Sequence, residues 1–192
     1  MVVTALRERP RGRVEVELDG APWRVLPADA VVRAGLSVGR ALDRETARTL
    51  ARELRRAGAL FRATRALASR DRSRRALEKR LERAGVPAAS RDEALGALER
   101  VGLVDDARVA HAQAAALAGR GYGDAAIRFD LEREGFPREA VVDAVAALEP
   151  EPERARRLLD RDGRSPRTLR RLAARGFDAA TIEDLGGFAA DA

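Results

Sequence analysis

The chain has 192 residues, of which 45% are hydrophobic but only 4% aromatic, so any core must consist mainly of Leu, Val and Ala. This length suits one or two ordinary domains, or a row of small units that share continuous packing. The residue mixture favours helices. Because the sequence contains no Cys, it excludes disulfide bonds, thiolate metal sites and a thiol nucleophile.

The chain is basic, with 37 Lys and Arg against 31 Asp and Glu and a formal net charge of +6. Such a surplus suits an anionic partner such as nucleic acid. Lys79 is the only Lys, and this bias reflects either a GC-rich genome or selection for bidentate phosphate contacts. No stretch approaches the roughly 20 apolar residues of a membrane span, and no secretory signal is visible. We therefore expect a soluble, cytoplasmic protein with no membrane partner.

The only convincing β pattern lies near the N-terminus. Apolar and charged residues alternate from Val14 to Leu18, and Asp19-Gly20 is typical of a two-residue hairpin turn. A lone hairpin is marginal in water, so we expect Trp23 to pack against a following helix rather than to stack on a nucleic-acid base. This small β-hairpin lies in a predicted N-terminal extension, residues 1–42.

From Asp43 onward the apolar spacing is that of helices. Asp43 is a typical N-cap, and it precedes an apolar stripe that ends near Gly58. The sequence therefore predicts a linking helix over residues 43–60.

The rest of the chain repeats itself. At an offset of about 50 residues, Leu77, Leu81 and Gly85 align with Ile127, Leu131 and Gly135, and a further offset of about 41 reaches Leu172 and Gly176. Each unit reads as three helices. The second helix stops at a Gly that can adopt the left-handed conformation, followed by an apolar residue that closes the cap.

Polar residues mark the expected helix starts. The second helices begin near Ser73, near Asp124 and at Ser165-Pro166, while Ser90 with Glu93 forms a capping-box pattern.

The sequence therefore predicts an all-α fold of tandem three-helix-bundle repeats, stacked in an elongated array after the N-terminal β-hairpin extension. Units of about 40 residues rarely bury enough area alone, so neighbouring repeats should stack. We expect repeats over residues 61–106, 107–150 and 151–192. The third is expected to be degenerate.

The sequence offers few residues that are suited to catalysis. His111 is the only His, and with no second His or Cys a structural role is favoured over a metal or catalytic one. Asp105-Asp106 is interpreted as helix capping. Gly119, Gly121 and Gly123 form a linker rather than a phosphate loop, because no strand precedes them and no Gly-Lys-Ser/Thr follows. We expect no enzyme activity, no metal and no cofactor.

Basic residues cluster in the first and third repeats, whereas the middle repeat leans acidic. In the first, Arg75 and Lys79 should face solvent opposite Leu77 and Leu81, and Arg83 follows on the same helix. The third repeat is rich in Arg, with members that include Arg154, Arg156, Arg157, Arg164, Arg167, Arg170, Arg171 and Arg175. The six candidate partner-binding residues are Arg75, Lys79, Arg83, Arg167, Arg170 and Arg171. The alternative is that they form ordinary solvated helix faces.

Phe129 points away from Ile127 and Leu131 on its predicted helix. We expect it to fill the seam to a neighbouring repeat, and the alternative is that it touches a partner.

The order and spacing of these motifs resemble the RecX regulatory family over about residues 43–150, and more weakly through 189. Val101 to Gly119 is similar to the family stretch in which an apolar pair precedes Asp and a helix. The family's middle repeat is matched by Gly121-Tyr122-Gly123, Ile127, Leu131 and Gly135-Phe136, and its first repeat by Ser73, Leu77 and Leu81. Gly186-Gly187 departs from the family pattern, which has apolar residues in the last helix, and this departure implies a degenerate third repeat.

The resemblance implies a monomeric, non-enzymatic protein that lodges along the RecA filament groove in recombination and DNA repair. It would oppose filament growth, ATP hydrolysis and strand exchange, and its basic residues would contact acidic filament surface or phosphate. Single-stranded or duplex DNA is a further, nonspecific partner. Two alternatives stay open: a helix-turn-helix transcription factor with strong sequence preference, and a solenoid adaptor for other proteins.

Overall fold

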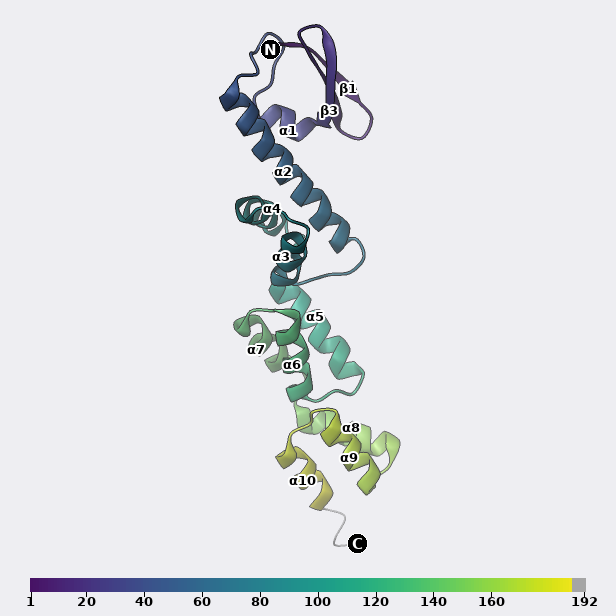
Figure 1. Cartoon of the computed structure of the whole chain (residues 1–192). Helices are drawn as coiled ribbons and strands as arrows, with labels where there is room; N and C mark the ends of the chain where they lie inside the picture. The colour runs from purple at the N-terminus through teal and green to yellow at the C-terminus, as the bar shows by residue number, and fades with distance from the viewer. Residues whose placement is uncertain (188–192) are drawn as a thin grey trace. The chain divides into compact units, whose positions relative to one another are not determined.

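The computed structural model describes residues 1–187, which form one three-stranded antiparallel sheet and ten helices (Figure 1). The chain divides into two compact units. The first combines residues 1–70 and 77–103, and the second combines residues 71–76 with the chain from residue 104 onward. Within residues 1–187, no helix is both long and apolar enough to cross a lipid bilayer.

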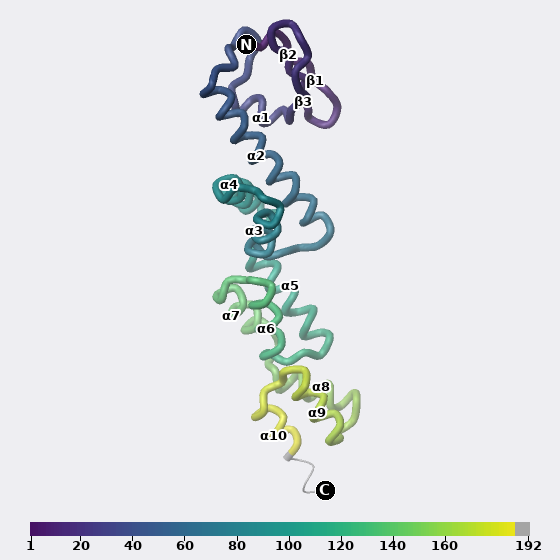
Figure 2. The backbone as a smooth tube through the Cα atoms, in the orientation of Figure 1, coloured from purple at the N-terminus to yellow at the C-terminus, as the bar shows by residue number. Residues whose placement is uncertain are grey.

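The backbone can be followed through these elements in Figure 2. The strands are β1 (Val3–Arg9), β2 (Arg13–Leu18) and β3 (Ala21–Pro27). They are followed by α1 (Ala28–Arg33), α2 (Arg44–Leu67), α3 (Arg74–Arg83) and α4 (Ala88–Arg100). The second unit continues with α5 (Asp106–Gly119), α6 (Asp124–Glu134), α7 (Arg138–Ala146), α8 (Glu151–Asp162), α9 (Pro166–Ala174) and α10 (Ala179–Gly187). The helical character of the chain after Asp43 is therefore confirmed.

The predicted hairpin is confirmed as β2 and β3, joined at Asp19 (φ 48°) and Gly20 (φ 83°). The sheet nevertheless has a third strand, β1, which pairs with β2 and which the sequence did not predict. Its pairing with β2 shifts register between Val3 and Ala5. Such an irregularity breaks the apolar alternation by which strands are recognised.

The sheet buries one face against α1 and the first turns of α2. Val16 and Leu26 of the sheet pack in one cluster with Val31 and Leu50 of these helices. Trp23 packs against the same cluster and is partly buried. The prediction that Trp23 serves packing is therefore confirmed, and the partial burial of its large ring helps to stabilise a sheet that would be marginal alone.

The linking helix begins as predicted but ends later. Asp43 accepts a hydrogen bond of 2.8 Å from the N–H of Thr46, which confirms it as the N-cap. The end predicted near Gly58 is wrong, because α2 continues to Leu67. A glycine inside a helix costs about 1 kcal/mol relative to Ala, and packing can outweigh this cost. Here α2 packs along α4, and the residues after Gly58 bury one face: Ala59, Ala63 and Ala66.

The Gly stops of the second helices are confirmed. Gly85, Gly135 and Gly176 have φ values of 73°, 86° and 80°, and each is followed by a buried apolar residue. The capping box at Ser90 and Glu93 is wrong, because α4 starts at Ala88, with Pro87 in the cap position and Ser90 buried within the helix. Pro87 has φ −59°, a value that its ring fixes, and no side chain caps this helix start.

Each of the last two helix triplets has its own core. In α5–α7 it includes Val109, Leu117, Ile127, Leu131, Phe136 and Val141. In α8–α10 it includes Ala155, Leu159, Leu172, Phe177 and Leu185.

Candidate partner-binding surface

The basic residues predicted on α3 share one exposed face. Arg75, Lys79 and Arg83 follow each other at intervals of four residues, and all three are exposed, while Leu77 and Leu81 are buried. Within residues 1–187, neither Lys79 nor Arg83 forms an ion pair. Their charges are therefore free to meet an anionic partner.

Arg75 also has a packing role that sequence reasoning missed. Its stem lies across the turn that follows α6, so close that a Cβ on Gly135 would be 3.0 Å from the Cδ of Arg75. Long basic side chains commonly bury their stems and leave the charge in water. A substitution of Arg75 would therefore disturb packing as well as remove a charge.

The arginines predicted on α9 are exposed, opposite the buried Leu172. Ser165 caps this helix by accepting a hydrogen bond from the N–H of Thr168, and Pro166 is its first residue, as predicted. Within the part of the chain that the structure describes, Arg167 forms no ion pair, and Arg170 donates only to the carbonyl O of Pro166, at 3.2 Å. These two guanidinium groups can turn toward a partner at little cost.

Arg171 is less free, because its guanidinium pairs with Asp162 at the end of α8. Arg161 also donates to Asp162, at 2.7 Å. The hydrogen bond from Arg161, helped by the charge of Arg171, lowers the pKa of Asp162 from 3.8 to about 2. The carboxylate therefore stays ionised near neutral pH, and Arg171 would have to leave it to meet a partner.

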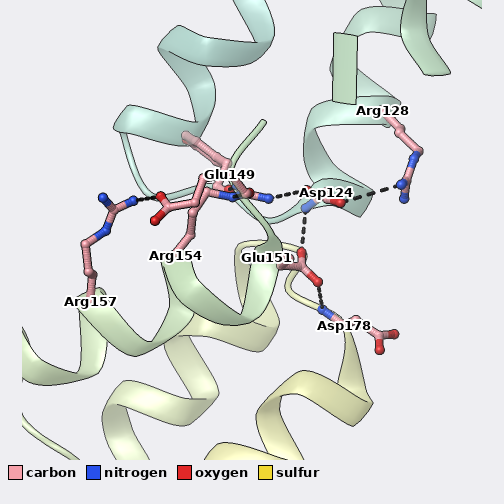
Figure 3. A network of polar contacts seen from close by, with 8 residues as sticks. Asp124, Arg128, Glu149, Glu151, Arg154, Arg157 and Asp178 are labelled. Carbon is pink, nitrogen blue, oxygen red and sulfur yellow. Dashed lines mark hydrogen bonds and ion pairs between the residues drawn. The ribbon is translucent and has the colours of Figure 1, made fainter. Parts of the chain in front are cut away.

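A different arginine of the third repeat is buried and serves the fold. Arg154 is 5% exposed, donates to the carbonyl O atoms of Glu149 and Tyr122 at 2.9 Å each, and pairs with Asp124 (Figure 3). Its ring contact is with Phe177, at 5.9 Å from the ring centroid. Arg154 therefore joins α8 to the start of α6 and is not available to a partner.

Glu151 completes this network. Its carboxylate accepts the N–H of Asp124 at 2.6 Å and that of Asp178 at 3.1 Å (Figure 3). Asp124 is the first residue of α6, one position after the cap residue Gly123. The first residue of α8 thus caps the start of α6, which nothing in the local sequence indicates.

Asp105 and Asp106 have different partners. Asp105 caps its own helix by accepting the N–H of Arg108 at 2.9 Å, as predicted. Asp106 instead accepts the N–H of Arg74, the first residue of α3, at 2.7 Å. His111 is exposed on α5, and residues 1–187 contain no group of His, Asp and Glu arranged to hold a metal ion.

Phe129 does not fill a seam, so that prediction is wrong. Its side chain on α6 is 66% exposed, because the apolar core of α5–α7 closes around Ile127 and Leu131 on the other face of the helix. The alternative, contact with a partner, stays a prediction.

Sequence reasoning missed a basic groove on the first unit. The groove has a volume of about 910 Å³, and α2 and α3 supply most of its wall. Its lining residues are Gly58, Phe61, Arg62, Arg65, Ala66, Ser69, Arg80, Leu81, Arg83 and Ala84. Phe61 is 68% exposed. The sequence does contain a signal of this groove. On the polar side of a helix, the aromatic residue Phe61 is followed by Arg62 and, four positions after Phe61, by Arg65.

Comparison with known proteins identifies relatives in sequence and in fold. No protein-family model matches the chain. The regulatory protein RecX of Xanthomonas axonopodis pv. citri (strain 306) is 35% identical over 126 residues, which are 60% of this chain and 78% of that protein. The regulatory protein RecX of Xanthomonas oryzae pv. oryzae (strain MAFF 311018) is also 35% identical over 126 residues, with 79% of its length covered.

Two solved structures share the fold. A crystal structure of regulatory protein RecX superimposes with a TM-score of 0.82 over 97% of this chain and 98% of its own, at 20% identity. RecX from Lactobacillus salivarius gives a TM-score of 0.59, covering 68% of this chain and 94% of its own, at 18% identity. The predicted fold, mainly helical with a small N-terminal β element, is confirmed.

Proposed function

The chain belongs to the RecX family, and from this premise we propose that it regulates the RecA recombinase by binding the RecA–DNA filament. Bound there, it restrains filament extension, ATP hydrolysis and strand exchange during recombination and DNA repair. The observation that carries the proposal is the 35% identity that spans 78% of a regulatory protein RecX. The protein acts through binding and supplies no catalytic group.

Exposed basic side chains support this mode of action. Lys79, Arg83, Arg167 and Arg170 are exposed and form no ion pair within residues 1–187, so a partner's carboxylates or phosphates need not displace an internal partner. Charge-assisted hydrogen bonds of Arg to carboxylate or phosphate are about twice as strong as neutral ones. Arg171 would contribute least, because Asp162 already holds it.

The direct test is RecA's ATP hydrolysis on single-stranded DNA, with the chain titrated in and an unrelated basic protein as control. We expect strong inhibition at less than one molecule per RecA. Inhibition that appears only when the DNA is saturated, and that the basic control reproduces, would instead identify a nonspecific DNA binder and contradict the proposal.

The exposed arginines of α9, which are Arg167, Arg170 and Arg171, form a face that has its own test. The double reversal Arg167→Glu with Arg170→Glu should weaken binding to the RecA filament without changing helicity. The matched control is Arg44→Glu with Arg48→Glu, two exposed positions on α2 where the net charge changes by the same amount. Equal weakening by both variants would show that only the total charge matters, and the assignment of α9 would fail.

A further inference from the structure

The groove on the first unit concentrates positive charge without a counter-charge. Its four arginines come in pairs three residues apart, Arg62 and Arg65 on α2 and Arg80 and Arg83 on α3. The lining contains no Asp or Glu, and none of the four arginines forms an ion pair within the described residues. Like charges gathered at one groove repel each other, so an anion that lies along it relieves this cost.

An exposed aromatic ring lies in the same groove. Phe61 is 68% exposed although Ala59, Ala63 and Ala66 on its helix are buried. The ring therefore contributes little to the core, and α2 presents it beside the cationic groups. A groove that combines cationic side chains with an accessible aromatic face is the arrangement that binds single strands, since every base has a face that can stack.

The size of the groove fits a short single strand. Its α2 wall runs from Gly58 to Ala66, which is about 12 Å along a helix that rises 1.5 Å per residue. This length accommodates a few nucleotides. In a duplex the base faces are already stacked, so a duplex could use the arginines but not the ring.

We propose that this groove binds single-stranded nucleic acid, with a base stacked on Phe61 and phosphates held by Arg62, Arg65, Arg80 and Arg83. Arg83 belongs both to this groove and to the basic side chains that support the proposed function, but binding of nucleic acid to the groove can be tested without the recombinase.

The role of the arginines is tested by fluorescence anisotropy. A labelled oligodeoxythymidine of about 12 nucleotides is titrated with the full chain at about 50 mM salt, and the dissociation constant is measured. We expect Arg62→Glu with Arg65→Glu to weaken binding at least about tenfold. The control Arg44→Glu with Arg48→Glu is centred about 26 Å away along the same helix and should weaken binding far less. Loss of two phosphate contacts should also flatten the log-log salt dependence by about 1.4, at about 0.7 per contact.

Stacking is tested separately. Phe61→Ala should weaken binding of the single strand about tenfold, whereas Phe61→Tyr should preserve it, and neither should change binding of a duplex of the same length. Phe129→Ala, which removes an equally exposed ring from the second unit, is the matched control. All variants should keep the wild-type circular dichroism spectrum, since the ring is outside the core.

Two results would overturn the proposal. One is failure of the wild-type chain to bind the oligonucleotide at this salt concentration. The other is a binding loss that is the same for the groove variants and their controls, which would mean that the net charge of the chain binds nucleic acid without this site.

Discussion

The main-chain N–H of Gly123 donates a hydrogen bond of 2.9 Å to the carbonyl O of Arg175, so the start of α6 lies backbone to backbone against the turn after α9. A Cβ on Gly123 would collide with the carbonyl group of Gly176 and the main-chain N of Phe177. The φ of Gly123 is −82°, which any residue adopts. Glycine is therefore required here for space and not for conformation.

This contact predicts that Gly123→Ala destabilises the second unit. Because the added methyl group meets main chain, which cannot turn aside as a side chain can, we expect a loss of about 1–3 kcal/mol in the free energy of unfolding. Gly119→Ala is the matched control: it lies on α5 with no atom within 4 Å of the new Cβ. Urea denaturation measures both. Equal stability of the two variants would contradict the close approach.

The same junction occurs once more within the second unit. Ser73 occupies the position that corresponds to Gly123, and its Oγ donates at 2.7 Å to the carbonyl O of Glu134, which corresponds to Arg175. The Oγ also accepts the N–H of Ala76 at 3.1 Å, as the predicted N-cap does. One hydroxyl thus serves as a cap and as a tie to another helix.

We expect Ser73→Ala to lower the free energy of unfolding by about 1–3 kcal/mol, because it removes the cap and leaves the carbonyl of Glu134 without this donor. Ser73 is fully buried, so water cannot replace the hydroxyl. Thermal denaturation of Ser73→Ala beside Ser37→Ala, whose side chain is exposed, measures the difference. If both variants melt at the wild-type temperature, the hydrogen bond from Ser73 to Glu134 contributes nothing to stability.

Arg154 should be the arginine whose loss is most damaging to stability. Arg154→Met keeps the stem but leaves the carbonyl O of Tyr122 without this donor and Asp124 with only its pair to Arg128. We therefore expect a loss of about 3 kcal/mol, the lower end of the cost of removing one side of a buried ion pair. Arg156→Met, at an exposed position on the same helix, should change stability little. Chemical denaturation distinguishes the two. A small effect of Arg154→Met would show that the network in Figure 3 is not structural.

The features that the sequence predicted correctly depend on neighbouring residues. The N-caps at Asp43 and Ser165 and the left-handed Gly stops are local signals, and each involves atoms within a few residues. The alignment of Leu77 with Ile127 follows from the repeat, because equivalent core positions select similar side chains.

The features that it missed depend on contacts between distant segments. In the sequence alone Gly58 indicates a helix end, although the helix continues because α4 packs along α2. Arg154 likewise indicates a surface charge, although it pairs with Asp124, which lies 30 residues earlier in the chain. The groove beside Phe61 exists only because α3 returns to α2. The hydrophobic pattern and the helix propensity of one segment do not encode its contacts with distant segments. The role of a charged residue therefore could not be decided from its own helix alone.

The carboxylate of Asp162 gives a pH-dependent prediction. Its pKa in the folded chain, about 2, is below the usual 3.8, so its pairing stabilises the fold above pH 4 and the stabilisation is lost as the pH falls toward 2. Arg161→Gln should raise this pKa more than Arg171→Gln, because the hydrogen bond from Arg161 is the largest cause of the shift. The carboxyl chemical shift of Asp162, followed by NMR against pH, measures each midpoint.

Asp162→Asn would then separate this structural pair from partner binding. The neutral amide cannot hold Arg171 as an ion pair, so the guanidinium becomes available beside Arg167 and Arg170. If the α9 face binds an anionic partner, the variant should bind at least as tightly as the wild type, and more so at low salt. Weaker binding would mean that the pair with Asp162 orients Arg171 for its partner, and that Arg171 belongs to the binding surface in its paired form.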